Sequence, residues 1–241
     1  MPVSYNILLF IITLAGGSIP LWVKTLDDRQ MHYLLAFSGS FLLSITFLHL
    51  LPESFAGLGN TTGLLLLTGF FLQLLIQRLT HGAEHGHTHI DTPHHHVQLA
   101  PVLTGLAIHA FMEGLPLGVH YLNQSTAPSL YLAVAAHKLP EAMLVASLIL
   151  HLKNKRQAFL FLVLFSLITP IASVLAGGLS LQHEQASKFV IILLPVVAGA
   201  FIHIATTIFF ESGTKQHTMS WQKVLAILTG LGLGLITLAF E

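Results

Sequence analysis

The stretch AVAAHKLPEAML, residues 133–144, places an imidazole, an ammonium and a carboxylate within one of the most apolar parts of the chain. A lysine alone costs about 2.5–3.5 kcal/mol at the centre of a membrane helix. The whole chain is apolar: of 241 residues, 54% are hydrophobic and 8% are charged, against about 25% charged in an ordinary soluble domain. Mean hydropathy is +0.77. We therefore predict an all-α, polytopic membrane protein.

Eight apolar windows along the chain are candidates for transmembrane helices. The third window has spanning length only if it begins near Thr61. The connections between windows are short and rich in turn residues, except for residues 81–97. The predicted spans are Tyr5–Val23, Tyr33–Leu51, Leu64–Gln77, Leu99–Leu122, Ser129–Leu152, Ala158–Leu179, Phe189–Phe210 and Val224–Phe240.

The distribution of basic residues predicts the orientation of these spans, because cytoplasmic loops are enriched in lysine and arginine. All the flanking basic residues but Lys188 fall on one side if the chain begins outside. They are Lys24, Arg29, Arg78, Lys153, Lys155, Arg156, Lys215 and Lys223. We expect a multi-pass protein of the cell membrane with both termini outside and residues 81–97 in the cytoplasm.

Two segments resemble each other weakly: GSFLLSITFLHLLPES at 39–54 and GAFIHIATTIFFES at 199–212 share a Gly-x-Phe opening, a histidine and a closing Glu-Ser. Spans 1–3 and 6–8 would run in opposite senses. This pattern predicts an inverted repeat of spans 1–3 and 6–8 around spans 4–5, as in many transporters.

Two pairs of ionisable residues lie deep within spans 4 and 5. His109 and Glu113 are four residues apart, as are His137 and Glu141, so each pair shares one helical face. Antiparallel neighbours joined by a short loop would bring the pairs together near the bilayer midplane. Two imidazoles and two carboxylates suit a divalent transition metal. Each pair alone could instead be a hydrogen bond between helices.

Other histidines and acids are weaker candidates. His49 and Glu53 near the end of span 2, and His203 in span 7, could line a pathway, although capping or interfacial roles explain the first two equally well. Residues 81–96 hold seven histidines and no apolar periodicity, so this loop could capture metal without a fixed fold. A polar linker that binds metal incidentally is the alternative. The loop candidates are His85, His87, His89, His94, His95 and His96.

Together these features resemble the ZIP (Zrt/Irt-like) metal-ion transporters. The resemblance rests on eight spans, the His-rich loop, H-x-x-x-E-G-x-x-x-G from His109 to Gly118, H-K-x-P-E from His137 to Glu141, and FLHLLPES in span 2. It implies that residues 1–241 form a single transmembrane transporter domain that takes zinc into the cytoplasm. It also implies a primary metal site at His109, Glu113, His137 and Glu141, and alternating access by movement of one helix bundle against another.

Three positions depart from the family pattern where binuclear members build a second, adjacent metal site. Ala110, Lys138 and Thr169 supply no good ligand there. We hypothesise that the Lys138 ammonium stands where a second cation would lie, which leaves a mononuclear site. The alternative is that Lys138 extends toward the membrane surface or pairs with a distant acid.

Two other function classes remain open from the residues alone. An intramembrane zinc-dependent hydrolase could use the same ligands, although no H-E-x-x-H is present. A proton-coupled carrier of an organic substrate could use the His/Glu pairs as a relay. The His-rich loop favours a metal carrier, so we expect no enzyme activity and no catalytic cofactor.

The expected cargo and partners follow from that preference. Zn²⁺ is the expected substrate, with Fe²⁺, Cd²⁺ and Mn²⁺ left open, and the missing cysteines argue against Cu⁺. The expected partners are these ions and the lipid bilayer, and a homodimer is left open. No nucleic acid is expected, because the formal net charge is zero.

Overall fold

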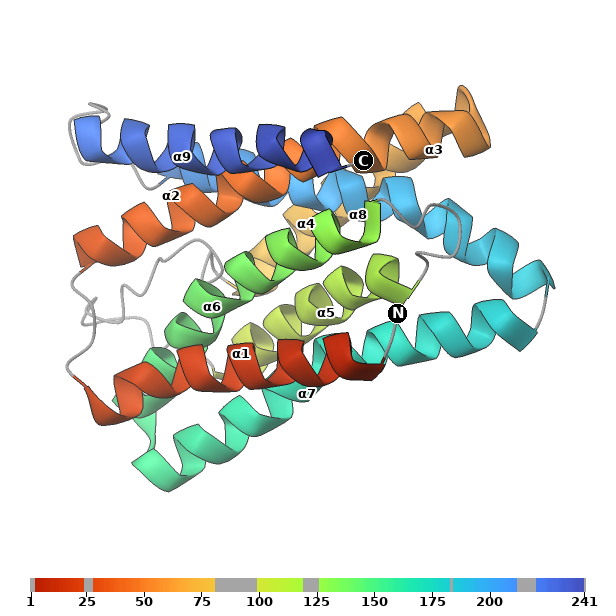
Figure 1. Ribbon diagram of the computed structural model, residues 1–241. Coiled ribbons are helices and arrows are strands. Elements are labelled where there is room, and N and C mark those ends of the chain that lie inside the picture. Colours follow the sequence, from red (N-terminus) through yellow and green to blue (C-terminus); the bar gives the residue numbers. More distant parts are fainter. Residues whose placement is uncertain are drawn as a thin grey trace.

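A computed structural model describes residues 3–23, 28–80, 99–118, 126–182, 184–211 and 220–240 (Figure 1). Throughout these residues the regular structure is helical, which confirms the all-α, polytopic prediction. The helices are α1 (Val3–Trp22), α2 (Asp28–Ile45), η1 (Thr46–Leu50), α3 (Leu51–Leu58), α4 (Thr61–Thr80), α5 (Leu99–Gly118), α6 (Thr126–Leu152), α7 (Lys155–Gln182), α8 (Glu184–Glu211), α9 (Trp221–Thr237) and η3 (Leu238–Phe240).

Seven helical segments of the described chain are long and apolar enough to cross a membrane, and α9 is a shorter apolar helix. α2, η1 and α3 join into one segment, Arg29–Leu58. Several helices extend past the predicted windows: α4 begins at Thr61, and α8 begins at Glu184 rather than Phe189. Helical hydrogen bonding continues into polar flanks that a hydropathy window leaves out.

Successive membrane-length helices reverse direction in Figure 1, so that α1 begins and α9 ends at the same end of the bundle. An even number of antiparallel spans gives this arrangement. It agrees with the expectation that both termini lie on one side of the membrane. Which side that is stays a prediction.

The helices pack most closely in four pairs: α2 with α9, α4 with α8, α5 with α7, and α1 with α6. Glycines allow the close approach in membrane helix pairs. A Cβ on Gly69 would lie 1.8 Å from the carbonyl oxygen of Val196, and one on Gly199 would lie 2.0 Å from that of Leu66. Neither position of the α4–α8 pair can accept a larger residue without separating the helices.

These pairs assemble into two groups, one of α1, α5, α6 and α7 and one of α2, η1, α3, α4, α8 and α9. In an inverted repeat, α1, α2 and α4 correspond to α7, α8 and α9, and α5 corresponds to α6. Under this correspondence the α2–α9 pair is equivalent to the α8–α4 pair. The α5–α7 pair is likewise equivalent to the α6–α1 pair. The pairing is what an inverted repeat would produce, although the repeat itself stays a prediction.

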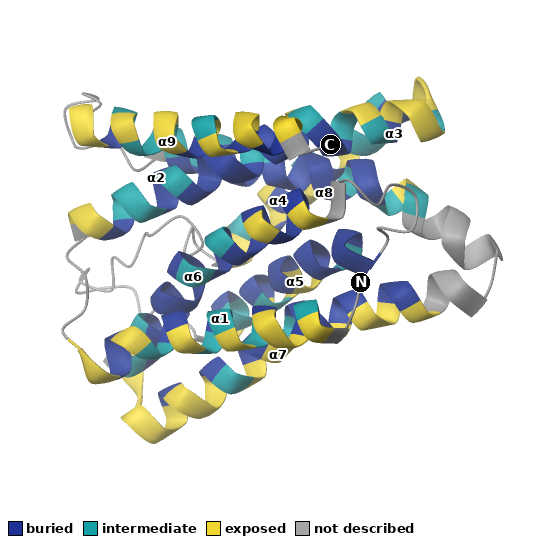
Figure 2. Ribbon diagram, in the orientation of Figure 1, coloured by how far each residue is buried: buried dark blue, intermediate teal, exposed yellow. Residues whose placement is uncertain are grey.

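Burial separates the interior helices from those that face the surroundings. In α6, 78% of the membrane-length window is buried, against 22% in α4. In Figure 2 the exposed positions run along the outer edges of α1, α7 and α9, whereas α5 and the middle of α6 are mostly buried. Because large apolar residues, leucine above all, occupy the exposed edges, these edges suit contact with lipid. Of the two helices with the ionisable pairs, α6 has the most buried window of the described spans, and the window of α5 is 56% buried.

Candidate metal centre

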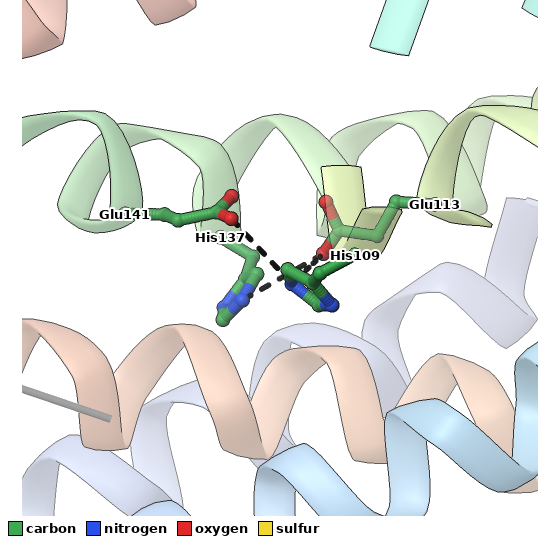
Figure 3. Close-up of side chains that lie close together, drawn as sticks. All are labelled: His109, Glu113, His137 and Glu141. Carbon is green, nitrogen blue, oxygen red and sulfur yellow. Dashed lines mark ion pairs between the residues drawn. The ribbon is translucent and has the colours of Figure 1, made fainter. Parts of the chain in front are cut away.

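The candidate site is a cluster of four buried side chains from two adjacent helices. α5 supplies His109 and Glu113, and α6 supplies His137 and Glu141 (Figure 3). The i, i+4 spacing puts each pair on one helix face, and all four residues are at most 1% exposed. One ligand atom from each residue lies within 4.8 Å of all the others. The structure thus brings together the four residues that the sequence selects.

The ligand atoms converge at ion-pair distances from one another (dashed lines in Figure 3). The Nε2 of His109 lies 3.2 Å from Glu113 Oε1 and 3.6 Å from Glu141 Oε1, and His137 Nε2 lies 3.6 Å from Glu113 Oε1. Within the described part of the chain these four atoms have no hydrogen-bond partner. Buried polar atoms are almost always satisfied. Two imidazole nitrogens and two carboxylate oxygens facing one point can hold a divalent cation.

Lys138 contacts the carboxylate oxygens of Glu113 and Glu141 that do not face the imidazoles. Its Nζ forms ion pairs with Oε2 of both Glu113 and Glu141, and it lies 5.1 Å from the centre of the Phe165 ring of α7. Each glutamate therefore turns one oxygen toward the imidazoles and the other toward the ammonium. Lys138 is 1% exposed, so it does not extend to the membrane surface, and its partners are the glutamates of the cluster. The alternative of snorkelling or a distant acid is excluded.

Two neighbouring helices hold this cluster in place. Ser38 of α2 lies with its Oγ 3.4 Å from His137 Nδ1. On the opposite side, Thr169 of α7 donates a hydrogen bond to the carbonyl of Ala110, with Oγ1 and the carbonyl oxygen 2.9 Å apart. Neither Ala110 nor Thr169 directs a ligand atom at the cluster. Sequence analysis did not identify Ser38 or Phe165, whose only signals are a serine within an apolar span and one of sixteen phenylalanines.

The three weaker histidine and acid candidates lie outside the four-residue cluster. His49 lies in the π-helical segment η1, just before Pro52, and its Nε2 is 2.9 Å from Thr237 Oγ1 of α9. Glu53 is one helical turn further, in α3. His203 of α8 pairs with Gln77 of α4, with Nε2 and Oε1 2.7 Å apart.

These contacts link helices and do not test a pathway role, which stays a prediction for His49, Glu53 and His203. The six candidate histidines of the 81–97 loop lie outside the described residues. Their capture of metal stays a prediction as well.

The fold and the cluster define a class: a polytopic helical membrane protein with a buried His/Glu site able to hold a metal ion. Comparison with known families agrees. A family model described as "ZIP Zinc transporter" matches residues 3–104 and 100–238. The chain belongs to this ZIP zinc transporter family. The description names a transporter, in keeping with the expectation of a carrier rather than an enzyme.

Curated relatives carry the same family name. The "Zinc transporter ZIP9" of Xenopus tropicalis is 29% identical over 166 residues, which are 65% of this chain and 54% of that protein. The "Zinc transporter ZIP9" of Micropogonias undulatus is 28% identical over 153 residues, 60% of this chain and 49% of that protein. The chain thus spans about half the length of the curated relatives it matches.

Proposed function

We propose that this protein carries divalent transition-metal ions, chiefly Zn²⁺, across the membrane into the cytoplasm through the cluster between α5 and α6. The observation that carries the proposal is the convergence of four buried ligand atoms without hydrogen-bond partners among the described residues. A cation satisfies all four at once and neutralises the two carboxylates. Relatives named zinc transporters support zinc as the cargo.

The ligand types support a preference among metals. Imidazole nitrogens favour Zn²⁺ and Fe²⁺ over Mn²⁺, which prefers oxygen ligands. Cd²⁺ remains a candidate because it is a divalent ion close to zinc in chemistry. The four residues serve as a binding site for cargo, so no resident cofactor is part of the proposal.

Transport into the cytoplasm is what the resemblance to ZIP transporters implies, and the predicted orientation places the candidate pathway residues along that direction. With the basic flanking residues in the cytoplasm, both termini and the α3 end of the second span face outside. His49 and Glu53 then lie between the cluster and the outside. His203 and Gln77 lie toward the inner ends of α8 and α4, so they flank the cluster on its cytoplasmic side.

Alternating access needs two parts that move relative to each other. All four ligands, Lys138 and Phe165 belong to the group of α1, α5, α6 and α7. The second group, with α2, η1, α3, α4, α8 and α9, contributes none of the four ligands. The packing therefore supports movement of the ligand-bearing group as one unit against the other.

Lys138 gives the proposed site its stoichiometry. Without a metal, the two carboxylates and the ammonium leave one negative charge, and one divalent ion turns this into one positive charge. A second cation would have to displace the ammonium from Oε2 of Glu113 and Glu141. The site therefore takes one ion, and repulsion by the ammonium favours the release of that ion.

The test is zinc flux into proteoliposomes that report internal metal. Wild type should give saturable flux, and Glu113→Gln and His137→Ala should both abolish it. Gly63→Ala is a matched control, because a Cβ there meets nothing within 4 Å, and it should transport normally. Zinc binding at one ion per chain without flux would contradict the proposal and favour an intramembrane hydrolase.

A further inference from the structure

Ser38 makes two contacts that bear on which nitrogen of His137 carries a proton. The Ser38 hydroxyl donates to the carbonyl of Leu35, with Oγ and that oxygen 3.1 Å apart. Its Oγ also lies 3.4 Å from His137 Nδ1. A serine hydroxyl has one proton and two lone pairs. Once the proton is directed to Leu35, Oγ can only accept a hydrogen bond from the ring.

The consequence falls on the opposite nitrogen of the ring. A neutral imidazole with a proton on Nδ1 has a bare lone pair on Nε2. In His137 this Nε2 points into the cluster, 3.6 Å from Glu113 Oε1. The other tautomer would direct an N–H at the position of the ion and could not bind it. Ser38 and His137 are both fully buried, so bulk water does not supply a competing acceptor.

We propose that Ser38 is a positioning residue for the metal centre: it accepts a hydrogen bond from Nδ1–H of His137 and so orients the ring with its Nε2 lone pair toward the cation. This inference rests on the proposed function. Residues that hydrogen-bond to a metal-binding histidine fix the tautomer and the orientation of its ring. Their loss typically weakens metal binding about 10–100-fold.

The position of Ser38 also connects binding to conformation. Ser38 is on α2, whereas the ligands are on α5 and α6, so the hydrogen bond crosses from one helix group to the other. Movement of α2 against α6 by more than about 1 Å would break a bond that is already 3.4 Å long. The affinity of the centre for metal therefore depends on how the two groups are packed.

The experiment measures zinc affinity by competition with a chelator, using the full chain in detergent. Ser38→Ala should bind Zn²⁺ at least about tenfold more weakly, and Ser38→Thr, which keeps the hydroxyl, should recover most of the affinity. Ser44→Ala is the matched control. Ser44 is a buried serine of the same helix whose hydroxyl donates to the carbonyl of Ser40, so this variant should bind as wild type does.

A second measurement reads the tautomer directly and needs no transport. Nitrogen NMR of the zinc-free protein, with His137 assigned by loss of its signals in His137→Ala, should show a protonated Nδ1 and a bare Nε2. Ser38→Ala should mix the two tautomers. A proton on Nε2 in wild type, or unchanged zinc affinity in Ser38→Ala, would overturn the inference. A wild type that binds no zinc would instead overturn the proposed function, while the NMR result still decides the role of Ser38.

Discussion

Replacing Lys138 by methionine removes the cation of the centre while keeping a long apolar side chain. The buried Lys138 ammonium contacts both Glu113 and Glu141. Breaking a buried ion pair by removing one partner costs about 3–5 kcal/mol, because an uncompensated charge stays behind. In the absence of metal, the free energy of unfolding of Lys138→Met should therefore be about 3–5 kcal/mol lower than that of wild type.

Zinc should reverse much of this loss. A divalent ion neutralises both glutamates whether or not the ammonium is present, and in the variant it is no longer repelled by Lys138. At a zinc concentration about 100 times the dissociation constant, binding adds about 2.7 kcal/mol to the stability. Because the variant lacks the repulsion by Lys138, it should bind zinc more tightly than wild type. At the same zinc concentration, its free energy of unfolding should therefore rise by more.

The assay is denaturant-induced unfolding of the purified chain in detergent, with and without zinc. Lys223→Met is the matched control. Lys223 is also buried, at 4% exposure, but its Nζ donates to the carbonyl of Phe209, 2.8 Å away. That variant should lose stability equally with and without zinc. The proposed role of Lys138 is refuted if Lys138→Met is as stable as wild type without zinc, or if zinc stabilises the two proteins equally.

Three further outcomes are expected. Lys138→Asp should bind two divalent ions per chain where wild type binds one, as counted by metal analysis of the purified protein; a single ion in the variant would remove Lys138 as the determinant. Gly69→Ala should lower the unfolding temperature sharply, because its Cβ would overlap the Val196 carbonyl, whereas Gly63→Ala should not. His203→Ala should slow zinc flux in proteoliposomes but leave one ion bound at equilibrium, and loss of the bound ion would place His203 in the centre itself.

Most of the fold could be predicted from the sequence because a bilayer imposes one strong requirement. Each span must be apolar over about 20 residues, and that length alone identifies the helices. Which helices pair could not be predicted in the same way. Faces toward lipid and faces toward other helices are both apolar, so periodicity does not separate them. The α4–α8 pair is instead formed by close approach at Gly69 and Gly199.

The four ligands of the centre could be predicted from the sequence, but the contact with Ser38 could not. The i, i+4 spacing within α5 and within α6 is a local property, so it places His109 with Glu113 and His137 with Glu141 before any packing is known. Ser38 is 99 residues from His137 in the chain, and it reaches the centre only because α2 packs on α6. Nothing in the sequence distinguishes a serine that contacts a histidine of another helix from one that only donates a hydrogen bond to a carbonyl of its own helix.

The lysine at 138 is costly only when it is considered alone. Lys138, Glu113 and Glu141 are at most 1% exposed, so neither the ammonium nor the carboxylates reach water, and each would be destabilising without the other. Together they leave a single net charge, and that charge is of the sign that attracts a cation. In the proposed function, the same ammonium would then repel the bound ion. We therefore expect the ion pairs that stabilise the buried glutamates also to limit the affinity for the ion, and a site that must release its ion needs that limit.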